Sequence, residues 1–192
     1  MYHLYNKVAT ESKLFKEEAD YHKFLALFHR YFQNYFDYLA YALIPNHFHF
    51  VVRVKPITEE VLVAEKTVRA RQLLAGDATV DMLLTHQAAR WFSSYMKGFN
   101  HRHRRTGPML KQGFRRVAQG TMSHILDKIA YNHHNAIHHG LVKEYHQHPF
   151  SSYNAFTQNK KTLMAKEEVL DWYGGLEGFL NYHQVYKDTF FR

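Results

Sequence analysis

The sequence predicts an α+β fold in which an antiparallel β-sheet is covered by α-helices. Two segments rich in aromatic and aliphatic residues, 37–44 and 47–54, are separated only by the turn dipeptide Pro45-Asn46, which predicts a hairpin. Longer segments repeat apolar residues at the spacing of one helix face. Along the chain the order is strand, helix, strand, strand, helix, strand, helix. This order favours an antiparallel sheet with helices on one or both faces.

The N-terminal part predicts a strand and then a helix. Residues 2–8 alternate loosely between polar and apolar side chains and predict the first strand, and Leu14-Phe15 predicts a short extended piece. Residues 17–36 predict an amphipathic helix, because their phenylalanines and leucines recur at helical spacing.

The middle of the chain predicts a connection, a second long helix and a further strand. Residues 55–79 are mixed in composition, with a short helix expected over 59–74, and are interpreted as an insertion or a mobile connection. Residues 80–101 predict the helix, and residues 109–118 predict an extended segment.

The last part predicts mainly helices. A third long helix is expected from 122 to 139, with Thr121 or Ser123 near its N-cap and Gly140 past its end. A loop is expected over 149–156. Two small helices are then expected, over 167–172 and 176–186, separated by two glycines.

The composition bounds the class of protein. Lys and Arg number 25 against 17 Asp and Glu, so the formal net charge is +8, which favours polyanionic partners. Aromatic residues make up 16% of the chain, and such rings stack on unpaired bases as well as filling cores. The chain has no cysteine, which excludes disulfides and thiolate metal sites. We expect a cytoplasmic protein, because the chain shows neither an apolar run of roughly 20 residues nor the apolar segment of a signal peptide.

A histidine pair at the start of the second hairpin strand is the sharpest local feature. His47 and His49 alternate with Phe48 and Phe50, so the two imidazoles share one face of the strand, about 7 Å apart at their roots. Two imidazoles at that spacing can converge on one metal ion, with a third ligand and a substrate oxygen completing the sphere of Mg²⁺ or Mn²⁺. The alternative is a pair of ordinary histidines on a solvated strand face.

The third helix offers a nucleophile. Tyr131 lies nearly opposite the apolar side of this helix, and Asn135 follows one turn later on the same face. Their side chains can present a phenol and a ligating oxygen to one centre. The alternative is a partly buried tyrosine that covers the core. The four histidines 133, 134, 138 and 139 spread over several faces, which argues against a structural zinc site.

A basic cluster with interleaved aromatic residues lies near the middle of the chain and predicts contacts to phosphates. The alternative is a solvated charged face. The predicted DNA-binding residues are Arg102, Arg104, Arg105, Lys111, Arg115 and Arg116.

Four segments together carry a family resemblance. Tyr2-His3-Leu4-Tyr5-Asn6-Lys7 matches an opening strand. Residues 42–49 contain Pro-Asn-His-X-His. Residues 107–115 look like a Gly-X-Leu-X-X-X-Arg-Phe-Lys strand. Residues 131–142 look like Tyr-Ile-His-X-Asn-Pro-Val-X-X-Gly-Leu-Val, and Ala136 stands in place of the usual proline. Ser151-Ser152-Tyr153 matches a tail motif. In this order, the segments resemble the single-tyrosine HUH transposases, especially the REP-associated tyrosine transposase branch.

The resemblance implies a fold, a reaction and a set of partners. The fold is a ferredoxin-like antiparallel sheet with flanking helices. Residues 1–157 form the catalytic domain, with an insertion over 55–80, and residues 158–192 form a small helical C-terminal extension. By this resemblance, His47, His49 and Asn135 are expected to hold Mg²⁺ or Mn²⁺. Tyr131 is expected to attack single-stranded DNA near a hairpin through a 5′-phosphotyrosine intermediate.

The resemblance implies a cytoplasmic protein associated with the nucleoid. It leaves the oligomeric state open, because relatives include both monomers and homodimers. A domesticated relative that binds structured DNA or RNA without cutting it is one alternative. A metal phosphoesterase that uses water as its nucleophile is another.

Overall fold

The computed structural model describes residues 1–8, 12–109 and 115–190 of the chain, and side chains as far as 189. These residues form two compact units. Residues 1–7, 37–53 and 115–192 make up the first, called the sheet unit, and residues 8–36 and 54–114 make up the second, called the helical unit. Within the described parts, no helix is both long and apolar enough to span a membrane.

A four-stranded sheet with the order β2-β3-β1-β4 organises the fold. Its strands are β1 (Tyr2–Lys7), β2 (Phe36–Ile44), β3 (His47–Val54) and β4 (Arg115–Ala118). β1 is central and pairs antiparallel with both β3 and β4. With α1 and α4 between the strands in sequence, this is the βαββαβ arrangement of ferredoxin-like folds. The predicted α+β class with an antiparallel sheet is confirmed.

The outer edge of β2 is covered by two bridges from the C-terminal region. Ala42 pairs with Ser151 in an antiparallel bridge, and Tyr38 pairs with Met164 in a parallel one. These contacts occupy backbone groups that an exposed edge strand would leave open to another chain.

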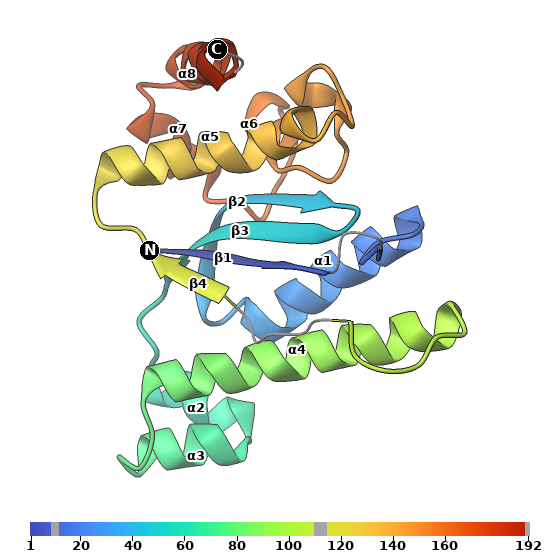
Figure 1. The fold of residues 1–192 in the computed structure, drawn as a ribbon. Coiled ribbons are helices and arrows are strands. Elements are labelled where there is room, and N and C mark those ends of the chain that lie inside the picture. The colour runs from blue at the N-terminus through green and yellow to red at the C-terminus, as the bar shows by residue number, and fades with distance from the viewer. Residues whose placement is uncertain (9–11, 110–114, 191–192) are drawn as a thin grey trace. The chain divides into compact units, whose positions relative to one another are not determined.

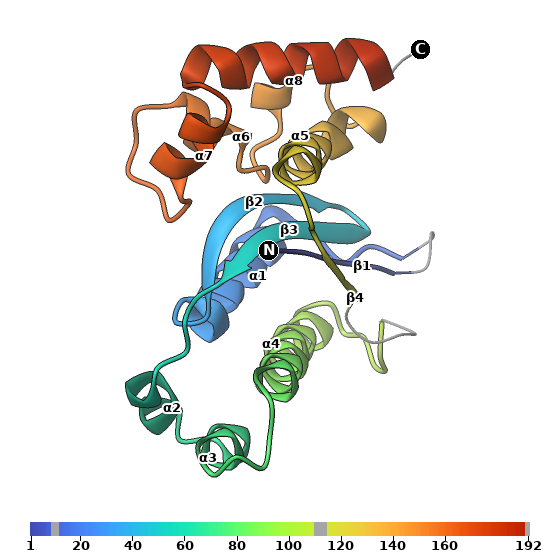
Figure 2. The same cartoon turned by 90° about the vertical axis from the view of Figure 1, so that its left-hand side faces the viewer.

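One face of the sheet packs against α5 (Met122–His138) and the helices that follow it (Figures 1 and 2). Their shared core includes Val51 from β3, Ile129 from α5 and Phe179 from α8 (Leu176–Phe190). The intervening elements are η1 (Tyr145–Gln147), α6 (Tyr153–Thr157) and α7 (Lys166–Trp172). Val169, Tyr173 and Phe179, from the segment predicted as an extension, therefore lie in the core of the sheet unit.

α5 is buried on more sides than its sequence pattern predicts. The predicted apolar side is confirmed by Ile125, Ile129 and Ile137 in the core. His133 and His134, on another side, are each about 1% exposed. They are buried because α8 and η1 pack against α5 as well.

The helical unit contains α1 (Glu18–Phe32), α2 (Glu59–Glu65), α3 (Val68–Leu74) and α4 (Val80–Arg102). The single helix expected over 59–74 is in fact two helices, because Lys66 adopts a left-handed conformation with φ of 55° between them. α1 and α4 pack through aromatic rings, with Phe24 tilted against Trp91 and Phe28 edge-to-face against it.

Two expectations about the sheet unit differ from the structure. Residues 149–156, expected as a loop, include the start of α6. The extended segment expected over 109–118 has a strand at 115–118, and residues 110–114 lie outside the described residues.

Candidate active site

The strand register brings His47 and His49 of β3 to the face of the sheet that α5 covers. His49 lies opposite Tyr5 of β1, and His47 lies opposite Lys7. Val51, two positions further along β3 on the same face, packs into the core formed with α5. Tyr131 and Asn135, one turn apart on α5, come close to the two histidines.

Both histidines are buried rather than solvated. His47 is 5% exposed and His49 is 6% exposed. Burial is the largest cause that lowers the pKa of His47 to about 4 and the pKa of His49 well below its usual value. Both rings are therefore neutral at pH 7, which is the form that ligates metals.

His47 faces an oxygen on each side of its ring. Its Nδ1 lies 2.6 Å from Asn46 Oδ1, and its Nε2 lies 3.5 Å from Asn135 Oδ1. A neutral imidazole has one N–H, and the shorter contact takes it, so Nδ1 donates to Asn46. The Nε2 lone pair then faces Asn135 Oδ1, because Asn135 Nδ2 donates to the carbonyl of Tyr131 at 2.9 Å. A nitrogen and an oxygen lone pair facing one another suit a cation between them, so these residues fit the metal that the resemblance implies.

A third histidine, His3 of β1, adjoins His49. His3 Nε2 lies 2.9 Å from His49 Nδ1, and the two rings are stacked with centroids 5.1 Å apart. His3 is 5% exposed, and burial, together with the charge of Lys128, lowers its pKa to about 3.

Tyr131 lies beside this histidine cluster. Its ring centroid is 5.6 Å from that of His49 and 6.3 Å from that of His3, both in edge-to-face arrangement. Lys128, one turn earlier on α5, places its Nζ 4.6 Å from the centre of the Tyr131 ring. Burial lowers the pKa of Lys128. The site therefore holds a phenol next to a cation and next to candidate metal ligands.

The end of α5 forms one side of the site. His139, the C-cap of α5, packs edge-to-face on His47 with ring centroids 4.7 Å apart. Gly140 follows with φ of 67°, a left-handed conformation that glycine adopts at little cost and that ends the helix here.

Two buried histidines of α5, His133 and His134, make internal contacts. His133 hydrogen-bonds to His183 of α8 and to Ser152, each at 2.8 Å. His134 contacts the Tyr145 hydroxyl at 3.3 Å. These contacts join α5 to its neighbouring helices and give the buried histidines a structural role.

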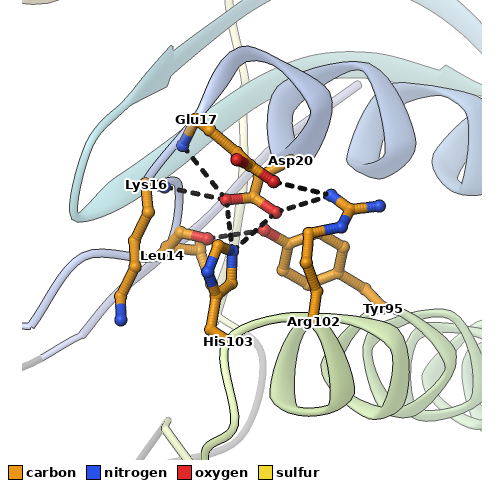
Figure 3. Close-up of polar contacts among 7 residues, drawn as sticks. All are labelled: Leu14, Lys16, Glu17, Asp20, Tyr95, Arg102 and His103. Atoms are coloured by element: carbon orange, nitrogen blue, oxygen red, sulfur yellow. Dashed lines mark hydrogen bonds and ion pairs between the residues drawn. The ribbon is translucent and has the colours of Figure 1, made fainter.

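Glu17, Asp20 and His103 in the helical unit offer ligand atoms that all lie within 4.8 Å of one another. Figure 3 shows the network of hydrogen bonds and ion pairs in which these side chains lie. The Asp20 carboxylate, 1% exposed, accepts hydrogen bonds from the backbone N–H of Lys16 and from Arg102 at 2.9 Å. His103 Nε2 lies 2.9 Å from the same carboxylate. The carboxylate joins the start of α1 to the end of α4.

The predicted DNA-binding residues fall in both units. In the helical unit, Arg102 pairs with Asp20, and Arg105 bonds to Asn100 and to the carbonyls of Gly107 and Pro108. Arg104 is exposed in the same loop. In the sheet unit, Arg115 and Arg116 are exposed on β4, and Lys111 lies outside the described residues.

His3 and Asn46 were not among the sequence-predicted site residues. The alternation of residues 2–8 predicts that His3 lies on a strand, but it does not predict that His3 shares a face with His49. The shared face depends on how two segments 46 residues apart pair. The sequence predicts Asn46 only as a turn residue. Because Asn46 directly precedes His47, its position in the sequence could have indicated a contact with that ring.

Comparison with known proteins adds a likeness in fold. No family model matches the chain. No curated protein matches it either. Among solved structures, the chain is similar to a REP-associated tyrosine transposase bound to a REP hairpin, with a TM-score of 0.55 and 14% sequence identity over 84% of this chain and 82% of that chain. At this identity the likeness shows a shared fold.

Proposed function

We propose that this protein is a transposase that cuts and rejoins single-stranded DNA near hairpins, with Tyr131 as the nucleophile. The observation that carries the proposal is the convergence of Tyr131 and Asn135 from α5 on the His47–His49 face of β3. The likeness in fold to a transposase bound to a DNA hairpin supports the same reaction class.

His47, His49 and Asn135 would hold Mg²⁺ or Mn²⁺. The neutral imidazoles and the inward-facing Asn135 Oδ1 supply the ligand atoms, and Asn46 orients His47 through its Nδ1. When bound, the cation would withdraw charge from the scissile phosphate.

Tyr131 carries the covalent step. Its Oη, once deprotonated, attacks the phosphorus in line and forms a 5′-phosphotyrosine bond, while the bond from phosphorus to the 3′-oxygen breaks. The leaving oxygen takes a proton and becomes a 3′-hydroxyl. Attack by another 3′-hydroxyl reverses the step and joins strands, so the reaction needs no external energy source.

Lys128 and His138 are the candidates for stabilising the phenolate of Tyr131 or for accepting its proton. Lys128 is the better placed, because its Nζ lies 4.6 Å from the Tyr131 ring centre. A cation at this distance stabilises the negative charge of a phenolate.

The candidates for DNA binding are arginines, and each unit carries some of them. Arg104, Arg115 and Arg116 are exposed, and the net charge of +8 attracts a polyanion. Arg102 and Arg105 also remain proposed DNA-binding residues, although both already bond within the helical unit.

The test is covalent capture of DNA. The protein is incubated with Mn²⁺ and hairpin oligonucleotides from sequence flanking its gene, labelled at the 5′ or the 3′ end, and analysed on a denaturing protein gel. We expect a shifted band that disappears with EDTA and in Tyr131→Phe. Tyr5→Phe is the matched control, because Tyr5 is the other phenol near His49, with ring centroids 6.0 Å apart, and has no proposed chemical role.

Each other outcome identifies a different function. A covalent band that persists in Tyr131→Phe and is lost in Tyr5→Phe would move the nucleophile to Tyr5. Metal-dependent cleavage without a covalent band would indicate a phosphoesterase that uses water. Binding without cleavage across the flanking substrates would favour a non-cutting nucleic-acid-binding protein.

A further inference from the structure

We propose that His3 is a positioning residue that holds His49 in the tautomer required for metal binding. This inference rests on the proposed metal site of His47, His49 and Asn135. It gives β1 a role in the site, because His3 of β1 supplies the hydrogen-bond acceptor for His49.

The contact between the rings of His3 and His49 couples their tautomers. His3 Nε2 and His49 Nδ1 lie 2.9 Å apart, in a pair of nearly parallel rings with an angle of 10° between their planes. Both side chains are buried, with 5% and 6% of their surface exposed. With one hydrogen between these two nitrogens, one ring donates and the other accepts.

The direction of the hydrogen bond decides what His49 can do. If His3 donated, His49 would carry its own hydrogen on Nε2 and could offer no free lone pair to a cation. If His49 Nδ1–H donates to His3 Nε2, the lone pair of His49 Nε2 stays free for the metal. A metal-binding histidine commonly donates its second N–H to such a partner, which orients the ring and increases its basicity.

β1 fixes this partner in place. Tyr5 stacks on both rings, with its ring centroid 4.8 Å from that of His3 and 6.0 Å from that of His49. The backbone of β1 is paired on both edges, with β3 and with β4. Because His47 is oriented by Asn46 in the same way, each proposed histidine ligand has its own acceptor.

The first test reads the tautomers directly in the metal-free wild-type protein. Long-range ¹H–¹⁵N spectra of the imidazole rings are recorded near pH 7 and assigned with His3→Gln and His49→Gln. We expect His49 and His3 both to carry hydrogen on Nδ1. A hydrogen on Nε2 of His49 would overturn the proposal without bearing on Tyr131.

The second test measures Mn²⁺ affinity by calorimetry in two variants of similar volume. His3→Gln keeps an acceptor for His49 Nδ1–H and should bind within about threefold of the wild type. His3→Leu removes the acceptor and should bind about 10- to 100-fold more weakly. Thermal unfolding in EDTA checks that both variants fold, and if His3→Leu does not, the tautomer spectra still decide.

The pattern of failures separates this inference from the proposed function. Absence of Mn²⁺ binding in the wild type would contradict the proposed metal site itself. Equal affinity in wild type and His3→Leu would remove His3 from the site and leave the metal site intact. Pulsed EPR of bound Mn²⁺ should count two imidazoles in both wild type and His3→Gln. A fall from three to two would make His3 a ligand and overturn its role as a positioning residue.

Discussion

At the scale of single residues, burial keeps the histidines of the site in their neutral form. His3, His47 and His49 are all neutral at pH 7 because burial disfavours their charged forms. Lys128 supplies a cation, with its Nζ 4.6 Å from the centre of the Tyr131 ring. α5 therefore places a positive charge beside the phenol that it also carries.

Lys128 is expected to contribute through its charge. Lys128→Met should slow formation of the covalent complex about tenfold, equivalent to about 1.4 kcal/mol in the barrier, because it removes the cation beside the Tyr131 ring. The rate is measured in single turnover with hairpin DNA and Mn²⁺.

Lys128→Arg separates the two roles that Lys128 can have. Arginine keeps the positive charge but does not accept a proton near neutral pH. Recovery of the rate in Lys128→Arg would support charge stabilisation. A rate in Lys128→Met equal to the wild type would show that Lys128 takes no part.

At the scale of elements, α5 carries most of the proposed chemistry, and its ends are well defined. Thr121 caps its N-terminus, where the Thr121 hydroxyl accepts from the His124 N–H at 3.3 Å. At the other end, Gly140 N–H bonds to the carbonyl of Ile137 at 2.8 Å. Tyr131 lies in the interior of α5, and Asn135 lies in its last turn, where the N–H of His139 bonds to the Asn135 carbonyl at 3.0 Å.

Loss of the α5 cap should reduce stability without changing the chemistry. Thr121→Ala is expected to lower the free energy of unfolding by about 1 kcal/mol, because an N–H at the helix start loses its partner. Thr121→Ser keeps the hydroxyl and is the matched control. Urea unfolding measures the change, and an equal loss in both variants would contradict the capping role.

At the scale of the whole molecule, the histidines link stability to pH. Burial is the main cause that lowers the pKa of His183 to about 4 and of His133 well below the usual value. The unfolded chain binds protons near the ordinary value of 6.5, so between about pH 6.5 and 4 it holds more protons than the folded chain. The free energy of unfolding therefore falls as the pH falls through this range.

Removal of one buried histidine should flatten this dependence. We expect the urea midpoint of the wild type in EDTA to decrease steadily from pH 7 to pH 4.5, and His183→Gln to show a weaker decrease. The difference corresponds to at most about 3 kcal/mol. His22→Gln, at an exposed position paired with Glu18, should follow the wild type. Parallel curves for wild type and His183→Gln would contradict the assignment.

Much of the fold, and the side chains proposed for the chemistry, followed from local patterns. The alternation of His47 and His49 and the one-turn spacing of Tyr131 and Asn135 depend only on backbone geometry. The Pro45-Asn46 turn predicted the hairpin for the same reason. The division of the chain at residue 157, the metal ligands and the DNA-binding residues stay predictions.

The tertiary structure decided which distant segments meet. The register of β1 against β3 brings His3 to His49, and the packing of α1 on α4 brings Asp20 to Arg102. The packing of α8 buries His133, which sequence periodicity alone places on no particular side. Periodicity determines the face of an element, because it repeats with the backbone. The partner of that face depends on strand register and side-chain packing between segments far apart in sequence, and local patterns carry no information about these.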